Sequence, residues 1–209
     1  MLRRGRGAVM TLPLFPLNEV LFPGGLLHLK VFEARYLDLI GRCLREGGAF
    51  GVVALRSGSE VRGDGGEAVA LESCGVVVEL LDVDVAQPGI MQLRCRGRQR
   101  FELASSRQQG DGLWLGEVSL IDDDPILPLS EALAGSARGL AEAIAALAEQ
   151  GALPFLEPYR LDDAGWVANR WCEILPITLE AKQQLMRLED PLLRLRLVDE
   201  YLRGKGVVG

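Results

Sequence analysis

The hydrophobic pattern of this chain changes from strand-like to helix-like at the segment Asp122-Asp123-Asp124-Pro125. Before this segment, apolar residues mostly alternate with polar ones, as in strands that bury one face. After it, they recur three or four residues apart, as in helices that bury one face. Strands that come first and helices that come later predict an α+β fold rather than a doubly wound sheet. We therefore expect a β-rich subdomain at residues 1–121 and a helical bundle at residues 122–209.

The N-terminal subdomain should contain strands and one inserted helix. Its first apolar segment, Leu12–Leu17, includes Pro13 and Pro16, which cannot donate to a ladder, so we expect it at a sheet edge or as an extended lead-in. A helix is predicted where Tyr36, Leu37, Ile40, Cys43 and Leu44 recur at helical spacing before Gly47-Gly48. The other predicted strands are Leu27–Phe32, Phe50–Leu55, Gly75–Val85, Met91–Leu103 and Leu113–Ile121, with a type II turn at Gln87-Pro88-Gly89 and a loop over Ser57–Glu67.

The C-terminal subdomain should contain about four helices, each with a residue that can cap its first turn. The predicted caps are Ser130, Asp162 or Asp163, Thr178, and Asp190, which is followed by Pro191 at the favoured first helical position. Trp171 lies on the apolar stripe of the second helix and Trp114 on an apolar strand face, so both are interpreted as core residues. Trp166 fits neither face, and it is a candidate surface anchor for a partner.

The most unusual local feature is a run of alternate arginines at Arg94, Arg96, Arg98 and Arg100. On a strand they would share one face, unless Gly97 introduces a bulge. Asp82 and Asp84 on the preceding strand would neutralise them across the hairpin. The face could be solvated and ion-paired, could dock an acidic protein, or could bind RNA. The net charge of −6 and the lack of interleaved aromatic residues argue against RNA. We favour the ion-paired face, treat Arg94, Arg96 and Arg98 as candidate interaction residues, and expect no nucleic-acid partner.

Glu33 and Arg35 begin the predicted N-terminal helix, where a charged pair has two interpretations. The pair could clamp a charged substrate, or it could be a structural ion pair that ties the start of the helix to the sheet. Glu33 also suits the positive end of the helix dipole. We favour the structural ion pair, because most such pairs carry no chemistry.

His28 is the single histidine, and it alternates with Leu27 and Leu29 on a predicted strand. Catalysis by serine or cysteine needs a histidine beside the nucleophile and an orienting partner, and the sequence has no G-x-S-x-G elbow. We expect no catalytic residue. The alternative is a small hydrolase-like enzyme with its site in a cleft. Clustering of His28 with a nucleophile and a carboxylate would favour the enzyme, whereas an apolar groove without titratable groups would favour a binding module.

Metal ions, cofactors and membranes are not expected as partners. The cysteines at 43, 74, 95 and 172 form no C-x-x-C pair, so they are interpreted as buried thiols in a reducing compartment. The carboxylates of Asp82 and Asp84 and of the Asp122–Asp124 run lack the glycine-turned loop of many cation sites. Arginines at 3, 4 and 6 suggest a signal peptide, but Pro13 and Pro16 interrupt its apolar core, and no run is long enough to span a bilayer. We expect a cytoplasmic protein.

Three segments near the N-terminus resemble the opening of the N-terminal domain of Lon proteases. They are Leu12-Pro13-Leu14-Phe15-Pro16-Leu17, the turn Phe22-Pro23-Gly24, and Val31-Phe32-Glu33-Ala34-Arg35-Tyr36. Later landmarks are Phe50-Gly51-Val52-Val53, Gly75, Gly97 with Arg100-Phe101, and Leu175-Pro176-Ile177 with Glu180, Lys182 and Gln183, so the resemblance runs from about Leu12 to Leu202. It implies a partly closed, PUA-like β-barrel with one inserted helix, then a helical bundle. It also implies a role in recognising polypeptide substrates.

The sequence contains no G-x-x-x-x-G-K-[ST] stretch, whose backbone would surround nucleotide phosphates. No segment follows residue 209 that could form an ATPase or a serine–lysine protease domain. We therefore expect a stand-alone, non-catalytic module or adaptor that binds polypeptide clients. An RNA-binding barrel is the remaining alternative to this module and to the cleft enzyme. The identity of the client and the oligomeric state stay open.

Overall fold

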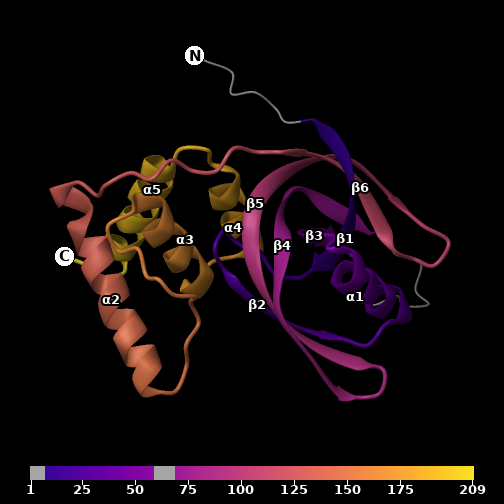
Figure 1. Ribbon diagram of the computed structural model, residues 1–209. Helices are drawn as coiled ribbons and strands as arrows, with labels where there is room; N and C mark the ends of the chain where they lie inside the picture. The colour runs from indigo at the N-terminus through magenta and orange to yellow at the C-terminus, as the bar shows by residue number, and fades with distance from the viewer. Residues whose placement is uncertain (1–7, 59–68) are drawn as a thin grey trace. The chain divides into compact units, whose positions relative to one another are not determined.

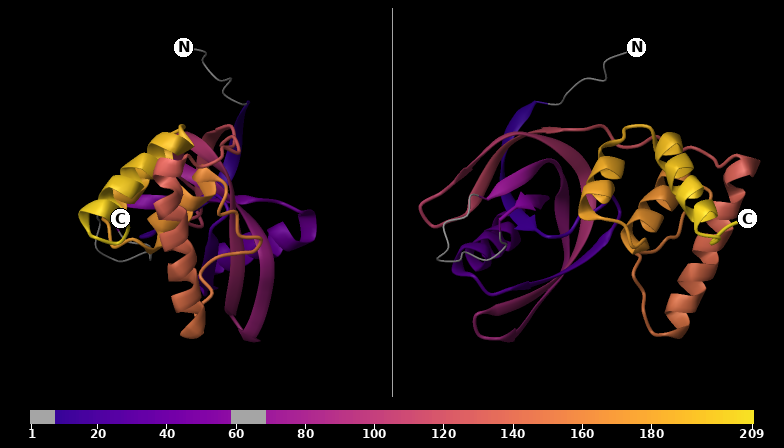
Figure 2. Two further views of the ribbon diagram at one scale, coloured as in Figure 1. Left: turned by 90° about the vertical axis from the view of Figure 1, so that its left-hand side faces the viewer. Right: turned by 180° about the vertical axis from the view of Figure 1, so that it is seen from behind.

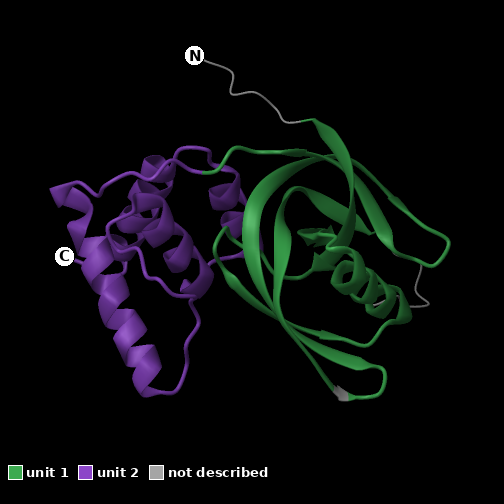
Figure 3. Cartoon of the chain, in the orientation of Figure 1, with its two compact units in different colours: residues 1–123 green, residues 124–209 purple. Residues whose placement is uncertain are grey.

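The computed structural model describes residues 8–58 and 69–209. The chain divides into two compact units, residues 1–123 and residues 124–209, which Figure 3 colours separately. The sequence analysis placed the boundary between residues 121 and 122. The predicted loop over Ser57–Glu67 falls largely outside the described residues.

Unit 1 is built on a six-stranded mixed sheet in the order β2-β5-β4-β3-β1-β6. β5 pairs with β6 as well, so the pairings of β5, β4, β3, β1 and β6 form a ring and β2 lies outside it. Figures 1 and 2 show β4 and β5 as long strands that curve together. The α+β class is confirmed, and the expected partly closed barrel takes the form of this ring. The strands are β1 (Val9–Leu17), β2 (Leu26–Val31), β3 (Phe50–Ser57), β4 (Ala70–Gln87), β5 (Ile90–Gln108) and β6 (Trp114–Leu120).

β1 lies between two strands, so its predicted place at a sheet edge is wrong. Its residues 9–14 pair with β6 and residues 14–17 pair with β3, and the two pairings overlap at Leu14 alone. Pro13 lies opposite Leu115 of β6, and Pro16 lies opposite Val53 of β3. At each proline, β1 pairs with one strand among those that the structure describes and leaves its other side unpaired. A proline can replace a residue whose N–H would point to that unpaired side, as it can in an edge strand.

The helix inserted in unit 1 is α1 (Ala34–Glu46). It ends as predicted at Gly47, whose φ of 70° is one that glycine adopts readily and whose N–H donates to the Cys43 carbonyl oxygen. The buried face contains Tyr36, Leu39, Ile40 and Cys43. Leu44, which the spacing placed on that face, is 55% exposed.

Gly51, Gly75 and Gly97, which lie in the segments that resemble the Lon N-terminal domain, leave no room for a side chain. A Cβ atom on Gly51 would lie 2.7 Å from the Phe101 ring, and one on Gly75 would lie 2.4 Å from it. A Cβ atom on Gly97 would lie 2.4 Å from the Phe22 carbonyl oxygen. The ring of Phe101 belongs to the core cluster of the sheet, against which Trp114 also packs. Each of these three glycines therefore lies where another residue of unit 1 approaches the backbone too closely for a Cβ atom.

Unit 2 consists of a short 3-10 turn and the helices α2, α3, α4 and α5. The predicted caps Asp163, Thr178 and Asp190 each accept a hydrogen bond from a backbone N–H in the first turn of their helix. Trp171 is 4% exposed, as predicted. In the part of the chain that the structure describes, no helix has the length and hydropathy needed to cross a bilayer. The elements are the turn Glu131–Leu133, α2 (Ala134–Glu149), α3 (Ala164–Ile174), α4 (Leu179–Arg187) and α5 (Pro191–Gly204).

Candidate functional site

Unit 2 carries an apolar groove of about 350 Å³ between α4 and α5. Two residues of the connection between α3 and α4, Leu175 and Ile177, also line it. Its lining residues are Leu175, Ile177, Ala181, Gln184, Leu185, Leu188, Leu197, Val198 and Tyr201.

Helical spacing and one buried arginine position the walls of the groove. On α4, Ala181 and Leu185 lie four residues apart and share one face, and on α5 Leu197 and Tyr201 do the same. Arg194 of α5 is 1% exposed and donates from Nε to the Leu185 carbonyl oxygen at 3.0 Å. It also donates to the carbonyl oxygen of Leu188, and its Nη1 lies 2.6 Å from Asp124 Oδ2. α5 is thereby fixed against the C-terminal end of α4.

The chemistry of the groove is that of a binding surface. Its described lining offers the Gln184 amide and the Tyr201 hydroxyl as polar groups, and no carboxylate, amine, imidazole or thiol. Leu197 is 43% exposed at its rim. Lys205 Nζ lies 5.6 Å from the centre of the Tyr201 ring, so one end of the groove carries a positive charge. Such a groove can take up apolar side chains, and its described lining holds no serine, cysteine, histidine, lysine or carboxylate.

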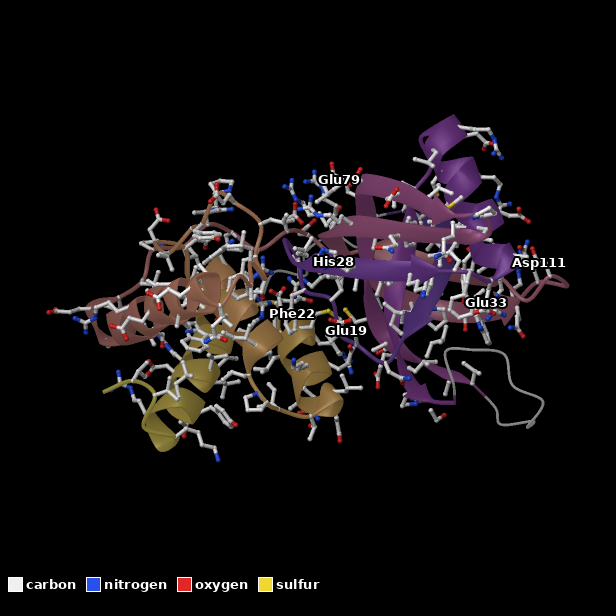
Figure 4. All side chains as sticks on the ribbon, turned by 90° about the horizontal axis from the view of Figure 1, so that it is seen from below. Glu19, Phe22, His28, Glu33, Glu79 and Asp111 are labelled. Atoms are coloured by element: carbon white, nitrogen blue, oxygen red, sulfur yellow. The ribbon has the colours of Figure 1, made fainter. Side chains whose placement is uncertain are left out.

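His28 lies elsewhere, on the exposed face of β2 opposite Arg94 of β5. It borders a pocket of about 300 Å³ in unit 1 whose described lining contains no serine or cysteine. Figure 4 shows Glu33 well apart from His28, towards the other end of β2. Among the described residues of this pocket, His28 is therefore not grouped with a nucleophile and a carboxylate, as a hydrolase would require.

Glu33 and Arg35 meet as an ion pair, with 2.7 Å between Arg35 Nη2 and Glu33 Oε2. Arg35 also donates from Nη1 to the carbonyl oxygen of Gly112, in the connection between β5 and β6, at 3.0 Å. Its guanidinium carbon lies 4.8 Å from the centre of the Tyr36 ring. This geometry ties the first turn of α1 to the sheet.

The arginine stripe is partly neutralised by Glu79, whereas Asp82 and Asp84 were the carboxylates expected. Glu79 Oε2 lies 3.8 Å from Arg96 Nη1 and 3.6 Å from Arg98 Nη1. Asp82 lies opposite Arg94 in the ladder, whereas Asp84 lies opposite Gln92. An extra residue on β5 between Gly97 and Arg100 shifts the register, and Arg100 is 3% exposed. The stripe is thus interrupted after Arg98, close to the glycine that suggested a bulge.

Trp166 belongs to an aromatic group in unit 2 and does not line the groove. Its ring centre lies 6.3 Å from that of Phe155 and 5.9 Å from that of Tyr159. The guanidinium carbon of the buried Arg170 lies 5.7 Å from the Trp166 ring centre. The groove residues were missed by the sequence analysis, although Leu197, an apolar residue outside the buried face of α5, is a signal that could have pointed to them.

The cysteines at 43, 74, 95 and 172 are buried thiols. Burial raises the pKa of Cys95 to about 12 and that of Cys172 to about 12. Among residues 8–58 and 69–209, no group of three or more histidine, cysteine, aspartate and glutamate side chains could hold a metal ion.

The model of the ATP-dependent protease La (LON) substrate-binding domain family matches residues 11–204. A Lon protease from Anaeromyxobacter dehalogenans (strain 2CP-C) is 27% identical over 201 residues, which cover 93% of this chain but 23% of that protein. The crystal structure of a Lon N-terminal domain protein from Xanthomonas campestris is similar with a TM-score of 0.72 and 34% identity, over 92% of this chain and 98% of that one. The N-terminal domain of Mycobacterium avium complex Lon protease shares the fold, with a TM-score of 0.61, 17% identity, and coverage of 92% and 97%. The chain belongs to the family of LON substrate-binding domains.

Proposed function

We propose that this chain is a substrate-recognition module that binds polypeptide segments with exposed apolar side chains in the groove between α4 and α5, without cutting them. The observation that carries the proposal is the groove itself, which is apolar and whose described lining lacks acidic and basic side chains. Membership of a substrate-binding family supports the same conclusion. The ATPase and protease activities of a whole Lon protease are not transferred, because the match covers 23% of that protein's length.

The size of the groove sets the strength of binding that we expect. Burial of one leucine-sized side chain contributes about 1.5–3 kcal/mol, and a groove of about 350 Å³ has room for a few such groups. The loss of translational and conformational freedom offsets part of this gain. A single segment should therefore bind weakly and reversibly, with a dissociation constant on the order of micromolar to millimolar. Weak binding suits a module that holds many different clients and passes them on, which is the adaptor role within this proposal.

A matched pair of leucines on α5 allows a direct test. Leu197 lines the groove and is 43% exposed, whereas Leu193 does not line it and is 42% exposed. Binding of a reduced and S-carboxymethylated protein, which cannot refold, would be measured by fluorescence anisotropy. Leu197→Glu should weaken binding about tenfold or more, because it places a charge in an apolar site. Leu193→Glu should bind like the unaltered chain. Equal affinities for the two variants would show that the groove is not the site.

A further inference from the structure

β2 has one neighbour among the strands that the structure describes, and that neighbour is β5. The Gly97 N–H donates to the Gly25 carbonyl oxygen at 2.9 Å. The backbone of Gly25, next to the first residue of β2, therefore faces β5. Backbone groups of an antiparallel pair face the partner strand at every second residue. Leu27, Leu29 and Val31 therefore turn their N–H and C=O groups towards β5. Leu26, His28 and Lys30 turn theirs towards the open edge.

This open edge borders the pocket of about 300 Å³ in unit 1. One wall of the pocket consists of the consecutive residues 28–33, so the backbone of β2 itself forms that wall. The lining also includes Phe15, residues 17–19 and Tyr36, whose ring stacks on that of Phe15 at a ring-centre distance of 4.0 Å. His28, Lys30 and Phe32 are exposed, so the edge is accessible from solvent.

We propose that an extended polypeptide segment adds to the open edge of β2 as a further strand. This inference goes beyond the groove between α4 and α5, because it adds a second site, in unit 1, for the same class of client. Donors and acceptors that alternate along a strand edge match the backbone of an extended peptide. The pocket that this edge borders has Phe15, Leu17 and Tyr36 in its lining, which favours a segment with alternate apolar residues.

Backbone pairing at β2 gives the module a way to separate unfolded from folded clients. Every unfolded chain offers free N–H and C=O groups, whatever its sequence, whereas a folded protein has already paired most of its own. Lys30 is the fifth of the six residues of this short edge strand, and a charge on an edge strand is a common protection against pairing between copies of one chain.

Hydrogen exchange on the unaltered chain tests this directly. The probe is a nine-residue peptide of alternating valine and threonine with a lysine at each end, and exchange is followed by NMR at single amides. With the peptide at about ten times its dissociation constant, exchange at His28 and Lys30 should slow about tenfold. If the peptide binds and these two amides exchange as before, the inference is wrong.

Two substitutions at one position provide a second measurement. His28→Pro removes the outward N–H, which proline can do at a sheet edge without breaking the β2–β5 ladder. His28→Ala removes the imidazole and keeps the N–H. The proline variant should bind the peptide about fivefold more weakly than the alanine variant, the equivalent of one backbone hydrogen bond. Equal affinities of the two folded variants overturn strand addition.

Failure of this inference can be distinguished from failure of the proposed function. If the unfolded protein binds and Leu197→Glu weakens its binding, while His28 and Lys30 exchange as before with bound peptide, the groove stands and strand addition fails. If neither the unfolded protein nor the peptide binds, both the proposed function and strand addition fail.

Discussion

The Trp171 indole Nε1 donates a 2.9 Å hydrogen bond to the carbonyl oxygen of Ser136, and so joins α3 to α2. The Ser136 hydroxyl in turn donates to Asp199 Oδ1 of α5 at 2.7 Å. The core of unit 2 is therefore connected by polar contacts as well as by apolar packing. Both bonds are buried, so removal of one partner leaves a polar group without access to water.

We predict that Trp171→Ala lowers the free energy of unfolding by about 3–5 kcal/mol, as large core truncations do. Trp171→Phe keeps much of the ring volume and loses the hydrogen bond, so it should cost about 1–3 kcal/mol. Urea unfolding followed by circular dichroism gives both values. A near-wild-type unfolding curve for the alanine variant would show that this side chain does not support the core.

Features that depend on neighbouring residues could be predicted from the sequence. Asp163, Thr178 and Asp190 cap their helices because a short polar side chain before an apolar stripe can reach the first-turn N–H groups. Ser130 has the same local sequence signal, yet it precedes a 3-10 turn and makes no capping hydrogen bond within the described residues. The 3-10 turn Glu131–Leu133 lies between Ser130 and α2, so Ser130 is not the residue at which this helix begins.

Features that depend on distant residues could not be predicted in this way. Three register irregularities along the β4–β5 ladder set Glu79 opposite Arg96 and Asp84 opposite Gln92, because each irregularity moves later residues along the ladder. The closure of the ring depends on the pairings of β1 with β3 and with β6, which lie far from β1 in the sequence and which no local pattern records. The groove likewise depends on how Arg194 fixes α5 against α4, and a buried arginine cannot be distinguished from an exposed one by its neighbours in sequence.

The buried thiols predict a loss of stability at alkaline pH. Burial raises the pKa of Cys95 to about 12, whereas an unfolded cysteine titrates near about 8.5. Above about pH 8.5 the unfolded chain gives up a proton that the folded chain keeps, so rising pH favours unfolding. The Cys95 thiol therefore leaves the free energy of unfolding unchanged below about pH 8.5 and lowers it progressively between about pH 8.5 and about pH 12.

Cys95→Ala removes this titration and should flatten the pH profile. Between about pH 9 and 11, the free energy of unfolding should fall more steeply in the unaltered chain, by up to about 1.4 kcal/mol per pH unit. Denaturant unfolding at a series of pH values measures both slopes, and the comparison of slopes cancels the cost of the smaller side chain. Parallel profiles would mean that the Cys95 thiol is not held protonated by the fold.

The arginine face of β5 separates the polypeptide-binding proposal from an RNA-binding one. Arg96 and Arg98 share Glu79, and their side chains are 33% and 55% exposed. Exposed pairs of this kind contribute about 0–1 kcal/mol each, so the double variant Arg94→Gln, Arg96→Gln should unfold at nearly the same denaturant concentration as the unaltered chain. RNA affinity should be weak, steeply dependent on salt, and hardly changed by the two substitutions, because carboxylates on β4 already balance much of this charge.

Glu79→Gln is the matched control, since it removes the shared carboxylate and should strengthen salt-dependent RNA binding slightly. Filter binding of a single-stranded RNA at several salt concentrations measures all of these. If the unaltered chain binds that RNA tightly at about 0.15 M salt, and the folded double variant does not, then the arginine face is an RNA-binding surface and the polypeptide-binding proposal must give way.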